Sequence, residues 1–288
     1  MDDLLRERGC RPDFPLEFVK YGQYSPHSSE KSDSAPHPLA TATILGQPPR
    51  NLTIAILGQA PGISIIVPAL NEAGTIEACL KALQPVRRQG HELIVVDGGS
   101  TDNTVLVSQP FADRVLHASK GRACQMQAGA DVARGAVLWF LHADTLVPDN
   151  PDSEILAALN DGNRRWGYFN SQFHEHGMLL NRVSSLMNLR SRITQIATGD
   201  QGIFVTRELF EQVNGFQPIP LMEDIALSRT LKKVSPPARI RQPLVTSARR
   251  WKKHGVIRTI FLMWSLRLAY FLGVSPVTLE NYYKAHYT

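Results

Sequence analysis

Polar side chains follow three short apolar runs of the sequence, at positions where β-strands would end. In chain order these side chains are Asn71 and Glu72, then Asp97, and finally His142 and Asp144. In open α/β sheets, ligands bind beyond the carboxyl ends of the strands, so these residues are candidates for a binding site. The alternative is that they serve as turn and cap residues, which Asp and Asn commonly are.

A carboxylate at the end of a buried strand is suited to metal chemistry. Mg²⁺ and Mn²⁺ prefer oxygen ligands and keep open positions for phosphate oxygens, so Asp144 could hold a divalent cation on a diphosphate. Such a cation would neutralise the charge that develops on a departing diphosphate. His142 is a candidate second ligand, which would favour Mn²⁺, although a lone histidine is more often structural.

A second acidic group lies later in the chain. Glu223 and Asp224 stand at the head of an amphipathic segment, after the proline-rich sequence PIPLM. The helix dipole favours an acid there, so capping would explain one of them, whereas the pair could present a general base to a hydroxyl. Upstream, Asp200 and Gln201 lie between two glycines, in a turn that could shape the acceptor side of a site.

The elements that must position these residues are short strands alternating with helices. Runs rich in β-branched residues lie at residues 63–68, 92–97, 114–118 and 136–142. Between the first two runs, apolar residues recur at i, i+4 and i+7, as on one face of a helix. This alternation is typical of βαβ units, so we expect an α/β fold with a mostly parallel sheet flanked by helices.

The chain divides into three segments. Residues 1–61 are rich in Pro, Ser and Gln without periodicity, so we expect a poorly structured tail. Residues 62–248 carry the strand and helix pattern and form the expected catalytic domain. Residues 249–288 combine basic residues with an apolar run that is interrupted by Arg267, which favours a helix at a membrane surface or packed on its own domain.

Composition bounds the partners and the location. The chain has 288 residues, 43% of them apolar, and a formal net charge of +5. This mildly basic balance indicates a solvated face and anionic small ligands rather than a nucleic-acid partner. The start is too polar for a secretory signal peptide, and no apolar run is long enough to span a bilayer. We therefore expect a cytoplasmic protein, with the inner membrane surface as a further option.

Six motifs, taken in order, resemble the successive landmarks of family 2 glycosyltransferases: SIIVPALNE, ELIVVDGGSTDNT, KGRACQMQAGA, WFLHADT, GDQGIFVTRELFEQVNGF and MED. Each motif is weak alone, and their order along the chain gives the resemblance its specificity. The glycine-rich third motif and the DGGS variant are further similar to transferases associated with radical-SAM proteins, a subgroup linked to arsenosugar biosynthesis.

The resemblance implies a GT-A fold and inverting transfer of a hexosyl group from a UDP- or GDP-sugar to a small-molecule or lipid acceptor. It implies a metal, Mn²⁺ or Mg²⁺, on Asp144 with His142, and Asp224 as the base that Glu223 flanks. Implied nucleotide contacts are Pro68, Ala69, Asn71, Glu72, Asp97, Gly98, Lys120, Arg122 and Ala143. Implied contacts on the diphosphate or acceptor side are Asp200, Gln201, Arg249, Arg250 and Trp251.

Two positions depart from the family pattern. Many relatives have an acid where this chain has His142, which leaves the identity of the metal open. The second acid of the usual DDGS motif is Gly98 here.

Two other functions remain as alternatives. A sugar nucleotidyltransferase would use a related fold, but its glycine- and arginine-rich loop after the first strand is replaced by PALNEAG. A non-catalytic protein that binds nucleotide sugars or a membrane surface would keep the fold without turnover.

Overall fold

The computed structural model describes residues 62–287, except residues 161 and 176, and the expected tail at 1–61 lies outside this part. Eight strands form one sheet in the order β3-β2-β1-β4-β7-β6-β8-β5. The strands are β1 (Ile63–Ala69), β2 (Glu92–Asp97), β3 (Arg114–His117), β4 (Val137–Phe140), β5 (Thr145–Leu146), β6 (Trp166–Phe173), β7 (Phe204–Thr206) and β8 (Ala238–Thr246).

The sheet is parallel on one side and mixed on the other. Strands β3, β2, β1 and β4 run parallel to one another, so their carboxyl ends meet at one edge. Strand β7 is antiparallel to both β4 and β6, and β6 runs parallel to β8. Strand β5 closes the other edge antiparallel to β8. The predicted mostly parallel α/β architecture is confirmed.

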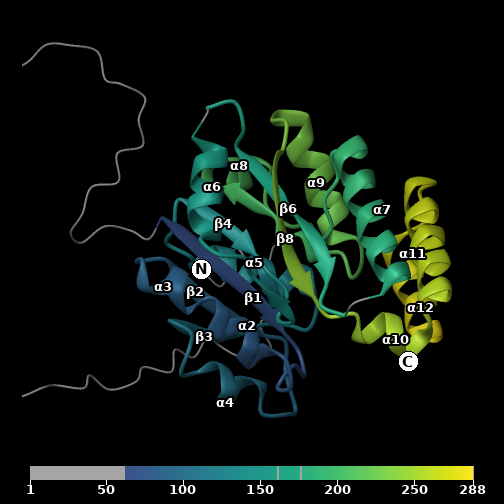
Figure 1. Cartoon of the computed structure of the whole chain (residues 1–288), viewed down its shortest axis with the longest axis horizontal. Helices are drawn as coiled ribbons and strands as arrows, with labels where there is room; N and C mark the ends of the chain where they lie inside the picture. Colours follow the sequence, from purple (N-terminus) through teal and green to yellow (C-terminus); the bar gives the residue numbers. More distant parts are fainter. Residues whose placement is uncertain (1–61, 161, 176, 288) are drawn as a thin grey trace, which may run out of the picture.

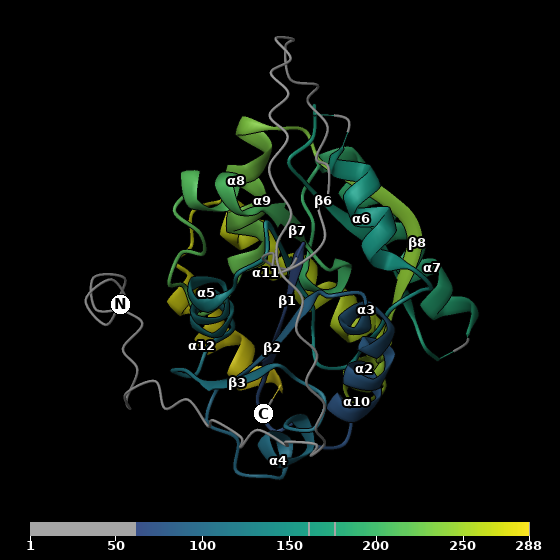
Figure 2. The same cartoon turned by 90° about the vertical axis from the view of Figure 1, so that its left-hand side faces the viewer.

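Helices connect and cover the strands. They are α2 (Ile76–Ala82), α3 (Gln84–Arg88), α4 (Thr104–Ser108), α5 (Arg122–Val132), α6 (Pro151–Leu159), α7 (Met178–Thr194), α8 (Arg207–Gln212), α9 (Glu223–Val234), α10 (Arg249–His254), α11 (Val256–Phe271) and α12 (Pro276–Tyr287), with a 3₁₀ turn η1 at Gly199–Gln201. Helices α5, α8 and α9 lie on one side of the sheet and α2, α3 and α6 on the other (Figure 2).

The core is split by the sheet into two layers. Side chains of a strand alternate between its faces, so Ile65 and Val67 of β1 face the layer beneath α2 and α3, while Ile66 faces the layer beneath α5 and α8. All seven residues of β1 are buried, as expected for a central strand of a sheet covered on both faces.

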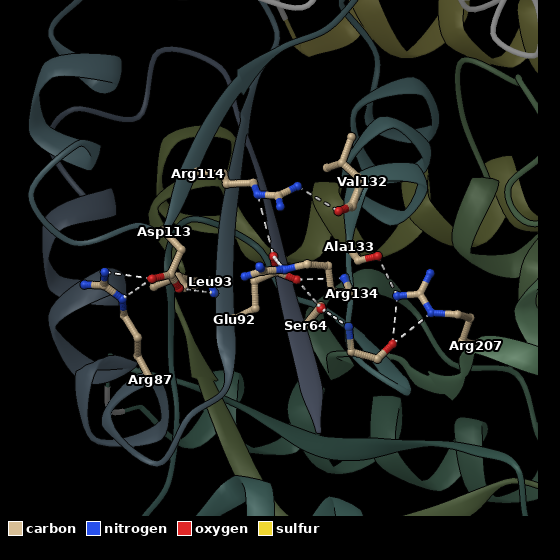
Figure 3. A network of polar contacts seen from close by, with 11 residues as sticks. Ser64, Arg87, Glu92, Leu93, Asp113, Arg114, Val132, Ala133, Arg134 and Arg207 are labelled. Carbon is tan, nitrogen blue, oxygen red and sulfur yellow. Dashed lines mark hydrogen bonds and ion pairs between the residues drawn. The ribbon is translucent and has the colours of Figure 1, made fainter. Parts of the chain in front are cut away.

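A polar network closes the amino ends of the central strands (Figure 3). The buried Glu92 carboxylate, at the start of β2, accepts hydrogen bonds from the Ser64 hydroxyl at 2.6 Å and from the Arg134 backbone N–H at 2.9 Å. The Arg134 Nε lies 3.0 Å and the Arg114 Nε 3.7 Å from the same carboxylate. This end of the sheet is therefore held by protein groups alone.

The C-terminal helices pack onto the rest of the chain. Helices α7, α10, α11 and α12 lie at one end of the molecule in Figure 1. Helix α11 contacts both α10 and α12, and Leu180 and Val183 of α7 share a cluster with Trp251 of α10 and Ile260 of α11. Leu262 and Leu266 of α11 join a cluster with Met222 and Ile225, which lie at the start of α9. The expected C-terminal helical segment therefore forms, and it contacts the element that carries the second acidic pair. In the described residues, no helix combines the length and apolarity needed to cross a membrane.

Candidate functional site

The ends of β1, β2 and β3 form one row, because Ala69 pairs with Asp97 and Asp97 pairs with His117 in the sheet register. Asp97 is 1% exposed. Its Oδ2 accepts hydrogen bonds from the backbone N–H groups of Gly99 and Ser100, both at 3.0 Å, and lies 3.3 Å from His117 Nδ1. Its Oδ1 is buried without a hydrogen-bond partner, so the row presents one unused acceptor.

The loops after β1 and β2 are tied together by Asn71. Its φ angle is 55°, a left-handed conformation that Asn tolerates better than most residues. The Asn71 Oδ1 accepts from the Thr101 backbone N–H at 2.8 Å, and its own N–H donates to the Ser100 hydroxyl at 2.8 Å. Asn71 therefore fixes the two loops to each other just beyond Pro68 and Ala69, the last residues of β1.

Gly98 has a local reason to be glycine. Gln125 of α5 is buried and donates from Nε2 to the Ala69 and Val96 carbonyls, both at 2.8 Å. A Cβ on Gly98 would lie 2.9 Å from the Gln125 side chain. The missing second acid of the DDGS pattern is thus replaced by a packed amide that bridges β1 and β2.

Glu72 contacts Arg249, which lies 177 positions later in the chain. The Arg249 guanidinium lies 3.0 Å from the Glu72 Oε2, which also accepts from the Thr75 hydroxyl at 2.7 Å. The side chain of Trp251 packs edge-on against Phe173, with ring centroids 5.3 Å apart. The side chain of Arg250 lies outside the described part of the structure.

Asp144 follows β4 within electrostatic reach of several site residues. Burial raises the pKa of its carboxyl, His142 and Arg122 lower it, and Asp200 and Glu72 raise it further. These electrostatic interactions indicate that the end of β4, the turn η1 and the loop after β1 lie near one another.

The His142 ring lies against Asp200 and Gly199. Only Nδ1 has a polar contact among the described residues, 3.1 Å from the Asp200 Oδ1, whereas Nε2 lies against Gly199, where an added Cβ would approach it to 2.3 Å. Gly199 is therefore glycine because the imidazole occupies the space of a side chain. This geometry favours His142 as the residue that orients Asp200 and η1.

The predicted general base is tied to the same turn. Asp224 Oδ2 accepts from the Gly199 N–H at 2.8 Å, and Oδ1 accepts from the Ile225 N–H at 2.7 Å. The neighbouring Glu223 is buried, and burial together with Asp224 raises its pKa to about 7, while Arg122 and His142 act to lower it. The Gln201 side chain points inward, where its Oε1 accepts from the Ser191 hydroxyl at 2.7 Å.

Arg122 connects the two acidic groups. It opens α5 and is coupled to Glu223, Asp200, Tyr283 and Asp224, which raise the pKa of its guanidinium against the effect of desolvation. It also acts on Asp144, so one cation spans both sides of the site. Lys120 and Ala143 differ in exposure: Lys120 is exposed beside the start of α5, and Ala143 is buried between His142 and Asp144.

Two arginines belong to this site that the motifs do not predict. Arg190 of α7 and Arg267 of α11 are both coupled electrostatically to Asp224 and Asp200. The available signal was the position of Arg267, a single charge inside an otherwise apolar helix. Arg190 carries no comparable signal, since α7 has several arginines and only the fold selects one of them.

No group of three or more His, Cys, Asp or Glu side chains within the described residues has the geometry of a metal site. The Asp144 carboxylate has no hydrogen bond or ion pair with the described residues. A carboxylate that is near-buried and unpaired suits Mg²⁺ or Mn²⁺ bound mainly through waters and ligand phosphates, which needs one or two protein carboxylates. The residues present fit that mode.

Comparisons with known proteins identify the family of this chain. A family model for glycosyl transferase family 2 matches residues 64–211. A PGL/p-HBAD biosynthesis glycosyltransferase from Mycobacterium bovis is 39% identical over 92 residues, which cover 30% of this chain and 36% of the relative. Glycosyltransferase AglE from Haloferax volcanii is 31% identical over 93 residues, covering 29% of this chain and 31% of AglE. The match thus spans about a third of these relatives.

Solved structures share the fold. Staphylococcus aureus TarS 1–349 superposes with a TM-score of 0.52 at 16% identity, covering 69% of this chain and 64% of that one. The mannosyltransferase PcManGT from Pyrobaculum calidifontis, in complex with GDP-Man and Mn²⁺, gives a TM-score of 0.52 at 22% identity, covering 74% and 62%. The expected GT-A architecture is confirmed by these neighbours.

Proposed function

Because the chain belongs to glycosyltransferase family 2, we propose that it transfers a hexosyl group from a UDP- or GDP-sugar to an acceptor hydroxyl. The observation that carries this proposal is the convergence of acidic groups at the turn η1. Asp200 in η1 lies 3.1 Å from His142, two residues before Asp144, and Asp224 accepts a hydrogen bond from Gly199, the first residue of η1. The charge of Arg122 acts on Asp144, and Arg122 in turn interacts with Asp200 and the Glu223–Asp224 pair. The relatives' names and the PcManGT complex support a nucleotide-sugar donor.

The nucleoside belongs in the row at the ends of β1 and β2. The unpartnered Asp97 Oδ1 suits a hydroxyl or N–H donor of the ligand, since a buried acceptor without a partner costs free energy. Pro68, Ala69, Asn71 and Gly98 build the walls of this pocket. Lys120 and Arg122 lie at the start of α5, from which they can approach a nucleotide.

The diphosphate belongs between this row and Asp144, where a divalent cation supplies charge neutralisation for the leaving group. We assign the metal to the Asp144 carboxylate, with His142 holding Asp200 in place rather than binding the ion. Arg249 sits over Glu72 at the entrance, from which it could move onto the diphosphate.

The transfer step follows from the position of Asp224. The acceptor oxygen forms a bond to the anomeric carbon, the bond from that carbon to the diphosphate oxygen breaks, and its electron pair leaves with the nucleoside diphosphate. Asp224 takes the hydroxyl proton as general base. A single displacement of this kind inverts the anomeric configuration, which NMR of the product would reveal.

A donor screen tests the function. Thermal unfolding is measured with UDP- and GDP-sugars, each with Mn²⁺, with Mg²⁺ and with no metal, because a ligand that binds the folded state raises the midpoint. We expect one donor to raise it only with metal, and that donor to be hydrolysed or transferred. Absence of stabilisation by every nucleotide sugar would refute the proposal.

The narrower similarity to radical-SAM-associated transferases is kept as part of the proposal. It rests on KGRACQMQAGA and on the glycine after Asp97, and the Gly98–Gln125 packing gives that variant a structural reason.

We further propose that the C-terminal helices contact a membrane at the inner, cytoplasmic surface. Phe261, Trp264 and Leu268 lie along α11 at i, i+3 and i+7, and each is at least 61% exposed. Residues 249–288 hold seven Lys or Arg and one acid, whereas the whole chain holds 31 and 26, so the first 248 residues are nearly neutral. An exposed aromatic stripe beside concentrated basic charge suits an anionic lipid surface.

Vesicle flotation tests this contact. Full-length protein should float with vesicles that contain phosphatidylglycerol and less well with phosphatidylcholine alone. A variant with Phe261→Ser and Trp264→Ser should lose binding roughly tenfold or more, because two large apolar side chains no longer leave water. Equal flotation of this variant would remove the stripe from the proposal.

A further inference from the structure

Arg190 is a partly buried cation with unused hydrogen-bonding capacity. It lies in the C-terminal part of α7, and one terminal nitrogen donates to the Ser191 hydroxyl at 2.8 Å. Its Nε is buried and has no hydrogen-bond partner. A buried donor without a partner costs free energy unless a ligand satisfies it. The Ser191 hydroxyl in turn donates to Gln201, so Arg190 is fixed beside η1.

Arg267 lies on α11, next to a residue that packs against the start of α9. The preceding Leu266 is 2% exposed and packs with Met222 and Ile225, on either side of the Glu223–Asp224 pair. Within the described residues, Arg267 has no hydrogen bond or ion pair. The C-terminal helix therefore carries an unpaired guanidinium close to the start of α9.

The two cations interact electrostatically with the same two acids, and the charge of Arg267 also acts on Arg190. Burial, followed by the charge of Arg267, lowers the pKa of Arg190 to about 10, so both guanidiniums stay charged at neutral pH. Asp224 and Asp200 act on both of them, yet no described carboxylate lies within ion-pair distance of either. Two like charges with spare donors form a site for an anion, and the fork of a guanidinium matches a carboxylate or phosphate.

The electrostatic interactions of the two arginines favour the acceptor side over the donor diphosphate as the place for such an anion. The charges that act on Asp144, where the diphosphate is proposed, come from His142, Asp200, Glu72 and Arg122. Neither Arg190 nor Arg267 is among them. The acid that both arginines share with the transfer step is Asp224, which faces the incoming hydroxyl in the proposed mechanism.

We propose that Arg190 and Arg267 bind a phosphate or carboxylate group of the acceptor and so orient the neighbouring hydroxyl toward Asp224. This inference rests on the proposed function for its orientation, and it restricts the acceptors to hydroxyl compounds that carry an anionic group.

The test measures binding of inorganic phosphate, and separately of acetate, to the full-length protein by calorimetry. Each titration is run with the nucleotide site empty and again with saturating UDP and GDP plus Mg²⁺. We expect saturable binding that persists with nucleotide present. Arg190→Gln and Arg267→Gln should each weaken it about tenfold or more, as for a lost hydrogen bond to a charged group, and Arg267→Lys should recover part of it.

Arg192→Gln is the matched control, because Arg192 is an exposed arginine two residues along the same helix. Thermal midpoints show whether each variant folds. Anion binding that is displaced by nucleotide would assign the pair to the leaving diphosphate and overturn the inference, as would absent binding or binding equal in all variants. Nucleotide binding in the same experiment reports on the proposed function separately, so either can fail while the other stands.

Acceptor preference gives a second readout. Glycerol, glycerate and glycerol 3-phosphate differ in the anionic group beside a hydroxyl, and the anionic pair should have the higher kcat/KM. In Arg267→Gln we expect this preference to shrink mainly through KM of the charged acceptors. A preference for neutral glycerol in the wild type would contradict the inference.

Discussion

A buried acid lies at each end of the parallel strands, and the two acids differ in how completely the protein satisfies their hydrogen-bonding capacity. Glu92, at the amino end of β2, is 2% exposed, and Asp97, at the carboxyl end of the same strand, is 1% exposed. Glu92 is surrounded by hydroxyl, amide and guanidinium donors from the protein (Figure 3). Asp97 keeps one oxygen without a partner. Burial of an acid therefore does not mark the site, whereas unused bonding capacity does.

The same contrast extends along the carboxyl ends. Arg190 Nε and Gln201 Nε2 are also buried without partners; Gln201 belongs to η1, and Arg190 is linked to it through Ser191. The criterion is not exclusive, because Asp152 Oδ1 at the amino end is unpartnered although Oδ2 contacts His91, and so are Trp139 Nε1, Thr145 Oγ1 and Ser171 Oγ. Buried polar atoms without partners are rare in folded proteins, so a group of them around one turn indicates a place for ligands.

The largest effect that we predict is on catalysis, from replacing an acid at the carboxyl ends of the strands. Asp224→Asn should lower kcat for sugar transfer about 10²- to 10⁴-fold, the usual contribution of a general base. The amide oxygen can accept from only one of the Gly199 and Ile225 N–H groups, so the thermal midpoint should also fall, and the rates are compared well below it. Steady-state kinetics with the donor identified by the screen provides the measurement. Transfer at the wild-type rate would remove Asp224 from the mechanism.

At the amino ends, replacing a buried acid by its amide should lower the stability of the fold instead of the rate of transfer. Glu92→Gln removes the charge that four groups share and leaves the Arg134 and Arg114 cations without it. We expect a loss of about 2–4 kcal/mol in the free energy of unfolding, measured by urea denaturation. Donor affinity should stay unchanged. A Glu92→Gln variant with wild-type stability and impaired donor binding would contradict the prediction, because it would place Glu92 in the donor site and not in the support of the fold.

Glu223 gives a pH-dependent prediction. Its pKa rises from 4.5 to about 7 on folding, chiefly through burial and then through Asp224. An acid with a raised pKa stabilises the fold below its unfolded pKa, and this contribution is lost as the pH rises through its folded value. The free energy of unfolding should therefore fall between pH 4.5 and 7 in the wild type. Glu223→Gln should remove about 3 kcal/mol of that fall.

Urea denaturation at several pH values measures this effect. Glu77→Gln is a suitable control, because Glu77 is an exposed acid at the start of α2. Parallel pH profiles for the wild type and Glu223→Gln would show that Glu223 is ionised at its ordinary pKa in the folded protein.

The smallest effect concerns the packing beneath the nucleoside pocket. Gly98→Ala places a Cβ against Gln125 and should cost about 1–2 kcal/mol as that side chain shifts. Combining it with Gln125→Ala should cost less than the sum of the two single changes, because the clash is then absent. Additive costs in a double-mutant cycle would show that Gly98 and Gln125 are independent.

Much of this arrangement could be predicted from the chain. The strands β1, β2, β3 and β4 were recognisable because buried parallel strands read as continuous apolar runs, and each acid follows such a run directly. Strands β6 and β8 have no such pattern. Pro243 interrupts β8 opposite an irregularity at Asn170, and a proline inside a run argues against a strand.

The residues on the acceptor side could not be predicted from the sequence, and the reason is different. Arg190 and Arg267 are 77 positions apart, as their numbers show, and only the packing of α11 on the start of α9 brings them to the same acids. Gln125 lies on a helix face of Ala and Gly, where sequence indicates close packing but not which amide is buried. Individual roles for the site residues therefore stay predictions until they are measured.

Donor binding by two variants tests the central claim most directly. Calorimetry with the identified nucleotide sugar is run on the wild type, Asp144→Asn and Asp224→Asn, with and without Mg²⁺ or Mn²⁺. The account predicts metal-dependent binding by the wild type and Asp224→Asn, and loss of that metal dependence in Asp144→Asn. Metal-dependent binding that survives in Asp144→Asn, or disappears in Asp224→Asn, would contradict a site in which one carboxylate serves the donor and the other the acceptor.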